Sequence, residues 1–370
     1  MFRQNNNVTG AVMVKHTIVH FYTDPNSTGG PTTYIDTITN SIYLCEHYDF
    51  GCVYQNKPLN KLRLCDIRRI ISELKYLEPD ILHVHGLQGE GFIGVLCGKL
   101  AGIKNVLVTV HGMQHDSFNT KGLKKFIFKH ILEKWTLQKA DAVFCVCESA
   151  EKSDYISKNA HCLLPYLHNC VSNMQEYDRE YEREILGYKA DDVVIVSVGR
   201  ITEGKGAAIL LKIILQDNDP NHKYLVLGDG NYLPIMKEKL KFENKSEKAI
   251  FTGAVSDVGR YLSAADLYIS TSYKENLSIS ILEAGYYSLP SLVTMVGGNG
   301  EIITSGENGE LFAVEDVSGF FLTLKEMETV GFKKYGENAK RNISENFSIH
   351  TFERGLKKIY DLVIRRGNAL

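Results

Sequence analysis

Several features that would assign this sequence to a special class are missing. No apolar run approaches the roughly 18 residues that a membrane-spanning helix requires. Residues 1–7 are polar, and no signal-peptide core follows them. The formal net charge of −2 over 370 residues excludes a nucleic-acid binder whose whole surface is basic. We therefore expect a cytoplasmic protein that has no nucleic-acid partner.

Paired cysteines are missing as well. The eight cysteines all lie in the first half of the chain, and none of them forms a C-x-x-C pair. This distribution predicts reduced, buried thiols rather than a disulfide framework or a zinc site. His85 and His111 end neighbouring expected strands, but no carboxylates that would complete a metal site stand near them in the sequence. We predict that the protein holds no metal ion and needs no cofactor.

What the sequence does contain is a repeated alternation of two patterns. Short apolar runs rich in β-branched residues alternate with stretches of helical periodicity, which indicates parallel sheets covered by helices on both faces. The expected strands are 16–22, 50–54, 81–84, 106–110, 142–146, 193–198, 224–227, 249–252, 267–270 and 291–294. The expected helices of the first half are 32–45, 67–77, 91–101 and 123–138, and a last helix is expected at 347–366.

The length and one interruption of this pattern predict two domains. A chain of 370 residues exceeds one typical hydrophobic core. The alternation pauses at the charged, tyrosine-rich residues 172–183 and then restarts. We predict an α/β fold of two doubly wound, Rossmann-like domains that face each other across a cleft. The expected boundaries are 1–172, a linker at 173–190, 191–346, and a C-terminal helix at 347–370 that caps either domain or crosses back to the first.

The first informative motif directly follows the expected strand 193–198. It reads Gly199-Arg200-Ile201-Thr202-Glu203-Gly204-Lys205-Gly206. Ligands of parallel sheets bind beyond the carboxyl ends of the strands, so Arg200 and Lys205 stand where a ligand is expected. Arginine forks two phosphate oxygens and lysine supplies a point charge, so this pair suits a diphosphate. The alternative is a surface turn with two solvated cations.

The second motif contains Glu275 and Glu283, which are separated by seven residues. Ser278 or Ser280 is expected to cap a helix between them, and the free N–H groups at its start favour a phosphate. Glu275 would then meet a sugar, and Glu283 the hydroxyls of a ribose. Together the two motifs fit a sugar nucleotide. Taken alone, the second is equally well explained by a glutamate at a helix dipole and an exposed helical glutamate.

The motifs as a set resemble one known family. The chain looks like a retaining glycosyltransferase of the GT-B fold, in the large group with an E-x7-E motif that includes sucrose synthases and bacterial lipopolysaccharide and mannosyl transferases. The resemblance covers nearly the whole chain. It rests on both motifs above and on Thr28-Gly29-Gly30, Asp80-Ile81-Leu82-His83-Val84-His85-Gly86, Val108-Thr109-Val110-His111-Gly112, Leu227-Gly228-Asp229-Gly230 and Gly297-Gly298-Asn299-Gly300-Glu301.

The resemblance implies roles for individual residues. Arg200 and Lys205 would bind the donor diphosphate, Glu283 the ribose, and Glu275 the donor sugar. His111 would lie against that sugar near the reacting carbon. The remaining donor-binding residues implied by the resemblance are Gly29, Gly30, Gly253, Ala254, Val255, Asn276, Leu277, Ser278 and Ile279. It also implies a nucleotide-sugar donor in which UDP is favoured, and a glycan or lipid-linked acceptor in surface polysaccharide synthesis.

A basic segment carries two open interpretations. Residues 57–139 contain 14 Lys or Arg against 7 Asp or Glu, an excess of +7. Within them, the stretch from Lys121 to Lys139 alternates lysines with large apolar residues. It is either a crossover helix with a solvated face or a surface that docks on anionic lipid at the inner face of a membrane.

Other functions stay open on the sequence. A sugar-nucleotide epimerase or a phosphorylase would share the fold. A dehydrogenase is disfavoured because Gly228-Asp229-Gly230 has Leu233 where a third glycine belongs. A silent partner subunit is disfavoured because Arg200, Lys205, Glu275 and Glu283 are all present.

Overall fold

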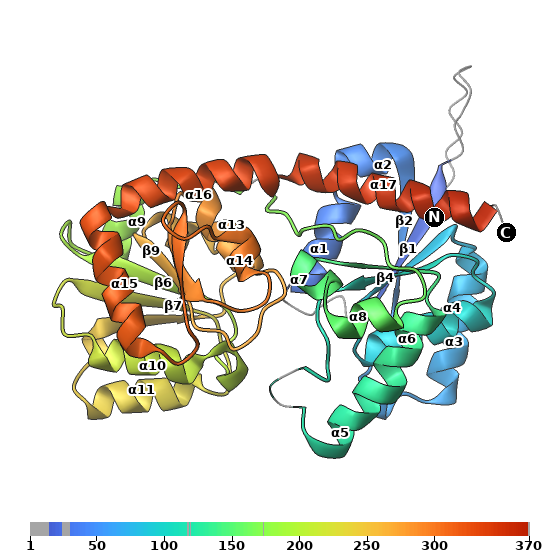
Figure 1. Ribbon diagram of the computed structural model, residues 1–370, viewed down its shortest axis with the longest axis horizontal. Coiled ribbons are helices and arrows are strands. Elements are labelled where there is room, and N and C mark those ends of the chain that lie inside the picture. Colours follow the sequence, from blue (N-terminus) through green and yellow to red (C-terminus); the bar gives the residue numbers. More distant parts are fainter. Residues whose placement is uncertain (1–14, 24–29, 117, 119, 173, 369–370) are drawn as a thin grey trace.

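The computed structural model describes residues 15–23, 30–116, 118, 120–172 and 174–368. Gly29, one of the expected donor-binding residues, lies outside this part of the chain. Figure 1 shows two α/β lobes side by side, with helices running across the top of both. In the described part of the chain, no helix is both long and apolar enough to cross a membrane.

The first lobe is built on a five-stranded parallel sheet in the order β2-β1-β3-β4-β5. Its strands are β1 (His16–Tyr22), β2 (Tyr48–Tyr54), β3 (Ile81–His85), β4 (Val106–Val110) and β5 (Ala142–Cys145). Its helices are α1 (Gly30–Thr39), α2 (Ile42–His47), the 3₁₀ turn η1 (Leu59–Lys61), α3 (Leu64–Leu77), α4 (Gly89–Ala101), α5 (Gly122–Ile127), the π-helical turn η2 (Phe128–Leu132), α6 (Glu133–Lys139), α7 (Glu148–Glu151) and α8 (Asp154–Asn159).

The second lobe is built on a six-stranded parallel sheet in the order β11-β10-β9-β6-β7-β8. Its strands are β6 (Val193–Val198), β7 (His222–Leu227), β8 (Ala249–Gly253), β9 (Leu267–Ser270), β10 (Ser291–Thr294) and β11 (Gly309–Phe312). Its helices are α9 (Arg179–Leu186), η3 (Glu203–Lys205), α10 (Ala207–Gln216), α11 (Leu233–Phe242), η4 (Ser246–Lys248), α12 (Gly259–Ser263), α13 (Ile279–Tyr286), α14 (Asn299–Ile302), α15 (Val317–Val330), α16 (Phe332–Asn346) and α17 (Ile349–Asn368), the last of which reaches the first lobe.

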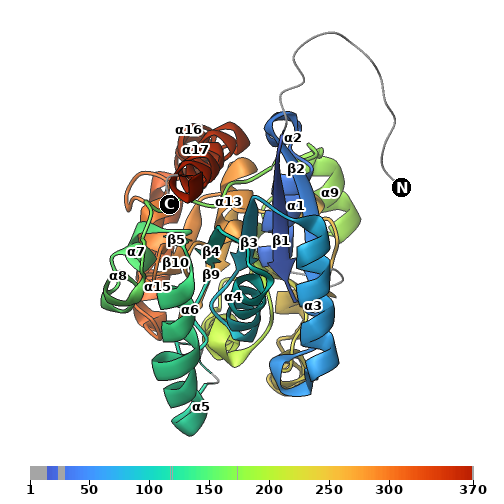
Figure 2. The ribbon, with the colours of Figure 1, turned by 90° about the vertical axis from the view of Figure 1, so that its right-hand side faces the viewer.

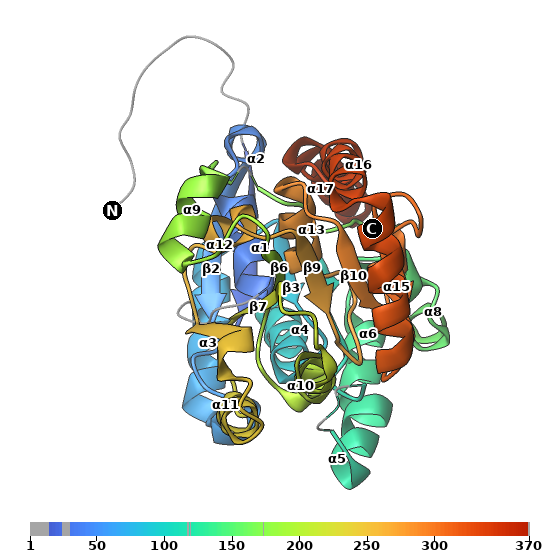
Figure 3. The ribbon, with the colours of Figure 1, turned by 90° about the vertical axis from the view of Figure 1, so that its left-hand side faces the viewer.

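Alternation along each strand produces the two covered faces. In β1, Val19 and Phe21 pack into one apolar cluster while Ile18 packs into another, because successive side chains point to opposite sides of a strand. Helices α3, α4 and α6 lie together along one face of the first sheet, as Figure 2 shows from the side of this lobe. Figure 3 shows the second lobe from its own side, with α10 and α15 beside its strands. Both sheets are therefore central layers, as predicted for doubly wound domains.

The C-terminal helix ties the two lobes together. Helix α16 packs on α13 in the second lobe, and α17 continues from it onto the first lobe (Figure 1). Phe352, Leu356 and Tyr360 of α17 are buried in the cluster that covers the first sheet. Ser41 donates a 2.5 Å hydrogen bond to Glu353, and Tyr48 donates a 2.7 Å bond to Asp361. Helix α17 thus crosses back to the first lobe.

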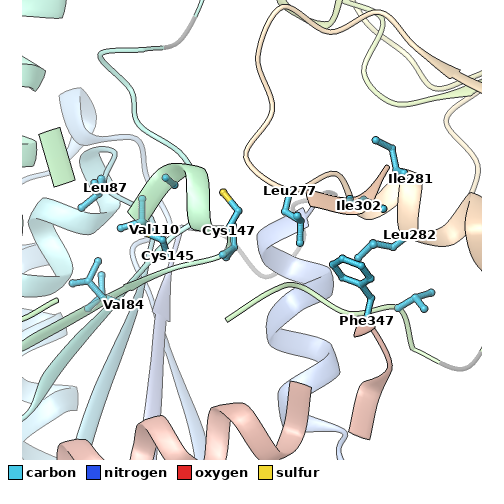
Figure 4. Close-up of a cluster of buried hydrophobic side chains, with 14 of the residues drawn as sticks. Val84, Leu87, Val110, Cys145, Cys147, Leu277, Ile281, Leu282, Ile302 and Phe347 are labelled. Carbon is cyan, nitrogen blue, oxygen red and sulfur yellow. The ribbon is translucent and has the colours of Figure 1, made fainter. Parts of the chain in front are cut away.

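A single apolar cluster also spans the junction between the lobes. Figure 4 shows Cys147, which follows β5, lying between the buried side chains of the first sheet and Leu277 of the second lobe. Leu282 and Phe347 continue the same cluster on the far side. This junction is close to the loops that follow both sheets, so packing here fixes how those loops face each other.

Several segments differ from the expectation, among them β11, the first expected helix and the linker. Strand β11 was not predicted, because Gly309-Glu310-Leu311-Phe312 is short and begins with a glycine. The helix expected at 32–45 is divided into α1 and α2, since the Ser41 side chain accepts a bond from the Leu44 N–H and caps a new helix. Helix α9 lies within the expected linker, and Arg183 donates to Asp266 of the second lobe.

Candidate active site

A large cleft lies between the carboxyl ends of the two sheets, with a volume of about 820 Å³. In each parallel sheet, the order in which the chain adds strands reverses at one place. This switch point lies between β1 and β3 in the first sheet and between β6 and β9 in the second. Loops at such switch points part from each other and leave a crevice for a ligand. The cleft is lined from both switch points, because Tyr22 and His85 face it from one side and Arg200 and Ser270 from the other.

The two motifs of the second lobe meet in this cleft. Lys205 Nζ lies 2.5 Å from Glu275 Oε1, and Ser272 Oγ donates to the same oxygen at 2.9 Å. The Glu275 side chain is 13% exposed and that of Lys205 is 33% exposed. The lysine and the glutamate therefore form a half-buried pair inside the cleft, although 70 residues separate them.

The close approach of the loops that carry Lys205 and Glu275 requires a glycine at position 206. Gly206 has a φ of +72°, and a Cβ atom there would lie 1.8 Å from the Thr271 carbonyl oxygen. No other residue fits without moving the loop after β9. Gly206 ends η3 and thereby presses the turn that carries Lys205 against the loop that carries Glu275.

Arg200 is the second cation of the cleft. It follows β6, its side chain is exposed, and no described residue accepts a hydrogen bond from it. A guanidinium in this position is available to an anionic ligand.

Helix α13 contributes its first turn and one acidic side chain. Ser278 is the N-cap residue, and Asn276, Leu277, Ser278 and Ile279 all line the cleft. The Asn276 side-chain nitrogen is buried and has no hydrogen-bond partner among the described residues. Glu283 also lines the cleft, and burial raises the pKa of its carboxyl group to about 7. The Asn276 side-chain nitrogen and the Glu283 carboxyl group are therefore available to form hydrogen bonds with a ligand.

The first lobe supplies His111 and Gly30. His111 follows β4, and its Nε2 lies 3.2 Å from Nδ1 of His85. Burial lowers the pKa of His111 to about 4, so the ring is neutral at physiological pH. Gly30 begins α1, and a Cβ atom built on it would lie 3.6 Å from Cδ1 of Ile279 in the other lobe. The start of α1 therefore lies directly opposite the start of α13.

Three expected donor-binding residues are absent from the lining of this cavity. Gly253, Ala254 and Val255 follow β8, which is the edge strand of the second sheet and is separated from β6 by β7. They are not among the residues that line the cavity. Gly253 pairs with Gly228, whose backbone lies against that of Gly199 at the rim of the cleft, so the contact of these three residues with the donor stays a prediction.

The structure also identifies cleft residues that the sequence did not suggest. Glu90 lies in the first turn of α4, lines the cleft, and has a carboxyl pKa that burial raises. Gln88, Asn169, Thr271 and Ser272 line it as well. Position after a switch-point strand is the signal that would have found Gln88 and Glu90, while Asn169 comes from an irregular segment.

One group of histidines has the spacing of metal ligands. In the described chain, nitrogens of His20, His83 and His85 all lie within 4.8 Å of one another. Hydrogen bonds occupy both nitrogens of His83, to Tyr360 at 2.8 Å and to Thr109 at 2.5 Å. His20 Nδ1 and His85 Nε2 lie 2.8 Å apart and bond to each other. Five of the six ring nitrogens in this group therefore have a neighbour at hydrogen-bond distance, and His20 Nε2 has none among the described residues.

Comparisons with known proteins agree with this geometry. Residues 178–344 match the family described as "Glycosyl transferases group 1", and residues 40–153 match "Glycosyltransferase Family 4". A UDP-Gal:alpha-D-GlcNAc-diphosphoundecaprenol alpha-1,3-galactosyltransferase from Escherichia coli is 24% identical over 323 residues, covering 81% of each chain. The putative glycosyltransferase EpsD of Bacillus subtilis is 24% identical over 298 residues, covering 75% of each.

Solved structures with the same fold include sucrose-phosphate synthase from Thermosynechococcus elongatus and HepE from Anabaena in complex with UDP-glucose. The first has a TM-score of 0.79 at 16% identity and covers 95% of this chain and 100% of its own. The second has a TM-score of 0.78 at 16% identity and covers 94% and 99%. The chain belongs to the group 1 glycosyltransferases, and its two lobes form the GT-B fold. It is a glycosyltransferase.

Proposed function

We propose that this enzyme transfers a hexose or N-acetylhexosamine from a UDP-sugar to a hydroxyl group of a glycan or lipid-linked acceptor. Transfer proceeds with retention of configuration at the anomeric carbon and serves surface polysaccharide assembly at the cytoplasmic face of the membrane. The observation that carries the proposal is the cleft arrangement of Arg200, Lys205, Glu275 and Glu283, in which two cations and two carboxylates stand within one cavity.

The cations act on the leaving group. As the bond between the sugar and the diphosphate breaks, negative charge grows on the phosphate oxygens. Arg200 and Lys205 are fixed positive groups aimed at that charge, and such preorganised stabilisation contributes roughly 3 kcal/mol per donor. We expect Lys205 to exchange Glu275 for a phosphate oxygen when the donor binds, since both partners are anionic.

The carboxylates act on hydroxyl groups. Glu275, once released from Lys205, accepts hydrogen bonds from the donor sugar, while Glu283 accepts them from the ribose. The acceptor hydroxyl approaches the same face of the sugar from which the phosphate leaves, and the departing phosphate takes its proton. This route needs no protein nucleophile, which suits a cavity whose side chains bind and stabilise.

The choice of UDP rests on relatives. The E. coli relative is named for UDP-Gal, and the HepE structure contains UDP-glucose. The names of the relatives described above are those of glycosyltransferases and a synthase rather than of an epimerase or a phosphorylase.

Thermal shift with UDP, GDP and ADP, each free and as a sugar conjugate, tests the donor. A ligand at about 100 times its dissociation constant adds near 3 kcal/mol to the free energy of unfolding. Acceptor-dependent release of UDP then tests transfer, and NMR of the product anomeric proton tests retention. Stabilisation by GDP but not UDP sugars would overturn the donor assignment, and an inverted product would overturn the stereochemistry.

We further propose that α5, η2 and α6 dock on anionic lipid, beside a lipid-linked acceptor. Leu123, Phe126 and Ile131 are 73%, 56% and 52% exposed and stand among lysines. Such a mixture of exposed apolar and cationic side chains is typical of helices that lie in a membrane interface. Transfer of exposed apolar side chains from water into lipid is favourable, so their insertion would stabilise the membrane-bound state.

Liposome co-sedimentation tests the docking surface. Changing Lys124, Lys125 and Lys129 to Glu should abolish binding to vesicles that contain phosphatidylglycerol. The matched control changes Lys237, Lys239 and Lys241, the lysines of α11 in the other lobe, with the same change of net charge. Equal binding by both triple variants would contradict docking through the first lobe.

A further inference from the structure

Three imidazole rings form a continuous chain from the interior of the first sheet to the cleft. His20 Nδ1 on β1 lies 2.8 Å from His85 Nε2 on β3, and His85 Nδ1 lies 3.2 Å from His111 Nε2 beyond β4. Strands β1, β3 and β4 are neighbours in the sheet, so the chain advances by one strand at each step. It ends in the cleft, because His111 is one of the lining residues.

The hydrogen-bonded chain of rings stops at His20, at its inner end. His20 is fully buried, and its Nε2 has no hydrogen-bond partner among the described residues. Its ring packs between Phe50, at a centroid distance of 5.6 Å, and His83, at 5.1 Å. The His83 nitrogens bond to Tyr360 and Thr109 instead. Among the described residues, His20 Nε2 is therefore the one ring nitrogen of the three-ring chain that is buried without a partner.

All three rings of the chain are neutral. Burial lowers the pKa of His20 to about 3 and that of His111 to about 4, and it lowers the pKa of His85 well below its ordinary range. The groups that face His85 from neighbouring elements are the other histidines and the ring of Tyr34, at 5.6 Å between centroids. None of these is an anion that would stabilise an imidazolium. Each ring therefore carries one hydrogen, on one of its two nitrogens.

Two arrangements of those hydrogens are consistent with the bonds. If His20 Nδ1 carries a hydrogen, it donates to His85, His85 donates to His111, and His111 keeps its hydrogen on Nδ1. If the chain runs the other way, His20 Nε2 carries a hydrogen that no group accepts. Buried donors without an acceptor are rarer in proteins than acceptors without a donor. The lack of an acceptor for His20 Nε2 among the described residues therefore favours the first arrangement.

We propose that His20 and His85 are positioning residues that hold His111 in the Nδ1–H form, so that this nitrogen donates a hydrogen bond to an oxygen of the bound donor. The inference rests on the proposed function for the identity of that oxygen, which belongs to the diphosphate or the sugar. A bare lone pair on Nδ1 would repel such an oxygen, whereas an N–H attracts it. The neutral ring supplies this donor without adding a third positive charge beside Arg200 and Lys205.

The test is the tautomer itself, read from the ¹⁵N shifts of labelled histidine in the free enzyme. His111→Gln identifies the His111 signals. In the wild-type protein we expect the hydrogen on Nδ1 of His111. In His20→Asp, a carboxylate accepts from His85 Nε2, so the chain reverses and the hydrogen moves to Nε2 of His111. In His20→Asn, the amide donates from near the position of Nδ1, and the wild-type tautomer is kept.

Activity provides the second readout. His20→Asp should lower kcat/KM for the sugar nucleotide by roughly tenfold to a hundredfold, the range of a hydrogen bond to a charged group, and His20→Asn should restore most of it. A hydrogen on Nε2 of wild-type His111 overturns the proposal, even if His20→Asp does not fold. So does an unchanged tautomer in His20→Asp. If the tautomer reverses as expected but the protein turns over no UDP-sugar, only the proposed function is contradicted.

Discussion

Lys205 Nζ lies 2.5 Å from Glu275 Oε1, so the cation of one motif and the first carboxylate of the other neutralise each other in the cleft. Each is a ligand-binding group in the proposed function. A half-buried charge without a partner destabilises the folded protein, and the Lys205–Glu275 pair avoids two such charges. Binding of a diphosphate sugar then replaces one ion pair by two sets of ligand contacts.

Removing either cation should abolish most turnover while leaving the fold intact. Arg200→Ala or Lys205→Ala should lower the rate of acceptor-dependent UDP release by about a hundredfold or more, because each removes roughly 3 kcal/mol of charge stabilisation in the transition state. Initial rates at saturating donor measure this effect. Circular dichroism and the thermal midpoint should stay near the wild-type values.

Lys212→Ala is the matched control, since Lys212 is an exposed lysine of α10 that does not line the cleft. It should keep the wild-type rate. Near wild-type turnover in Arg200→Ala or Lys205→Ala would refute the assignment of the diphosphate site.

Affinity for UDP should depend on pH through Glu283. Burial raises the pKa of this carboxyl group to about 7, so it is mostly protonated at pH 6 and mostly ionised at pH 8. The ionised form accepts hydrogen bonds from both ribose hydroxyls, and binding should therefore weaken as the pH falls. For one linked proton the dissociation constant should rise about tenfold between pH 8 and pH 6.

Isothermal titration calorimetry of UDP at both pH values measures this change. Glu283→Gln provides the reference, because it removes the titrating group while the phosphate of UDP still titrates. The ratio of the two dissociation constants should depend on pH. A constant ratio would show that Glu283 does not bind the ligand in its ionised form.

Local sequence signals were sufficient to group Arg200, Lys205, Glu275 and Glu283 in one cleft and insufficient for the rest of its lining. Arg200, Lys205, Glu275 and Glu283 follow strands at a switch point, and that position is visible in the order of apolar runs. The proposed role of His20 was not visible, because its hydrogen-bond partner His85 stands 65 residues away and only the strand order brings the two together. Gly253 follows the edge strand β8 and does not line the cavity, so its contact with the donor stays a prediction.

Stability of the second lobe should depend on pH through His222. Burial lowers the pKa of this ring, but its hydrogen bonds to Asp217 at 2.8 Å and Glu328 at 2.7 Å outweigh burial, and the net pKa is raised above 6.5. The stabilisation is therefore fully present below pH 6.5 and is lost as the pH rises through the raised pKa. The thermal midpoint of the wild type should exceed that of His222→Gln by more at pH 6 than at pH 9.

The control is His350→Gln, because the His350 side chain is 83% exposed. Its difference from the wild type should be small at both pH values. A wild-type advantage over His222→Gln that grows with pH would contradict the direction of the shift.

Glu301 of α14 fixes the junction between the lobes. Its carboxylate accepts bonds of 2.8 Å from the backbone N–H groups of Glu148 and Ser149 in the first lobe, and it pairs with His168 Nε2 at 2.8 Å. Burial alone would raise the pKa of this carboxyl group, but these bonds lower it, so the charged form is held in place. Hydrogen bonds to a charged group contribute about 1.5 to 3 kcal/mol each.

Glu301→Ala should therefore loosen the lobes without unfolding either. Small-angle scattering should report a larger radius of gyration, and kcat/KM should fall severalfold because the two halves of the cleft are less often aligned. Glu307→Ala is the control, since Glu307 is exposed nearby in the second lobe and its carboxylate accepts no hydrogen bond from a described residue. If Glu301→Ala and Glu307→Ala scatter alike and retain equal activity, the contact does not set the geometry of the cleft. If Glu301→Ala instead lowers the thermal midpoint with an unchanged radius, the contact stabilises a lobe rather than the junction.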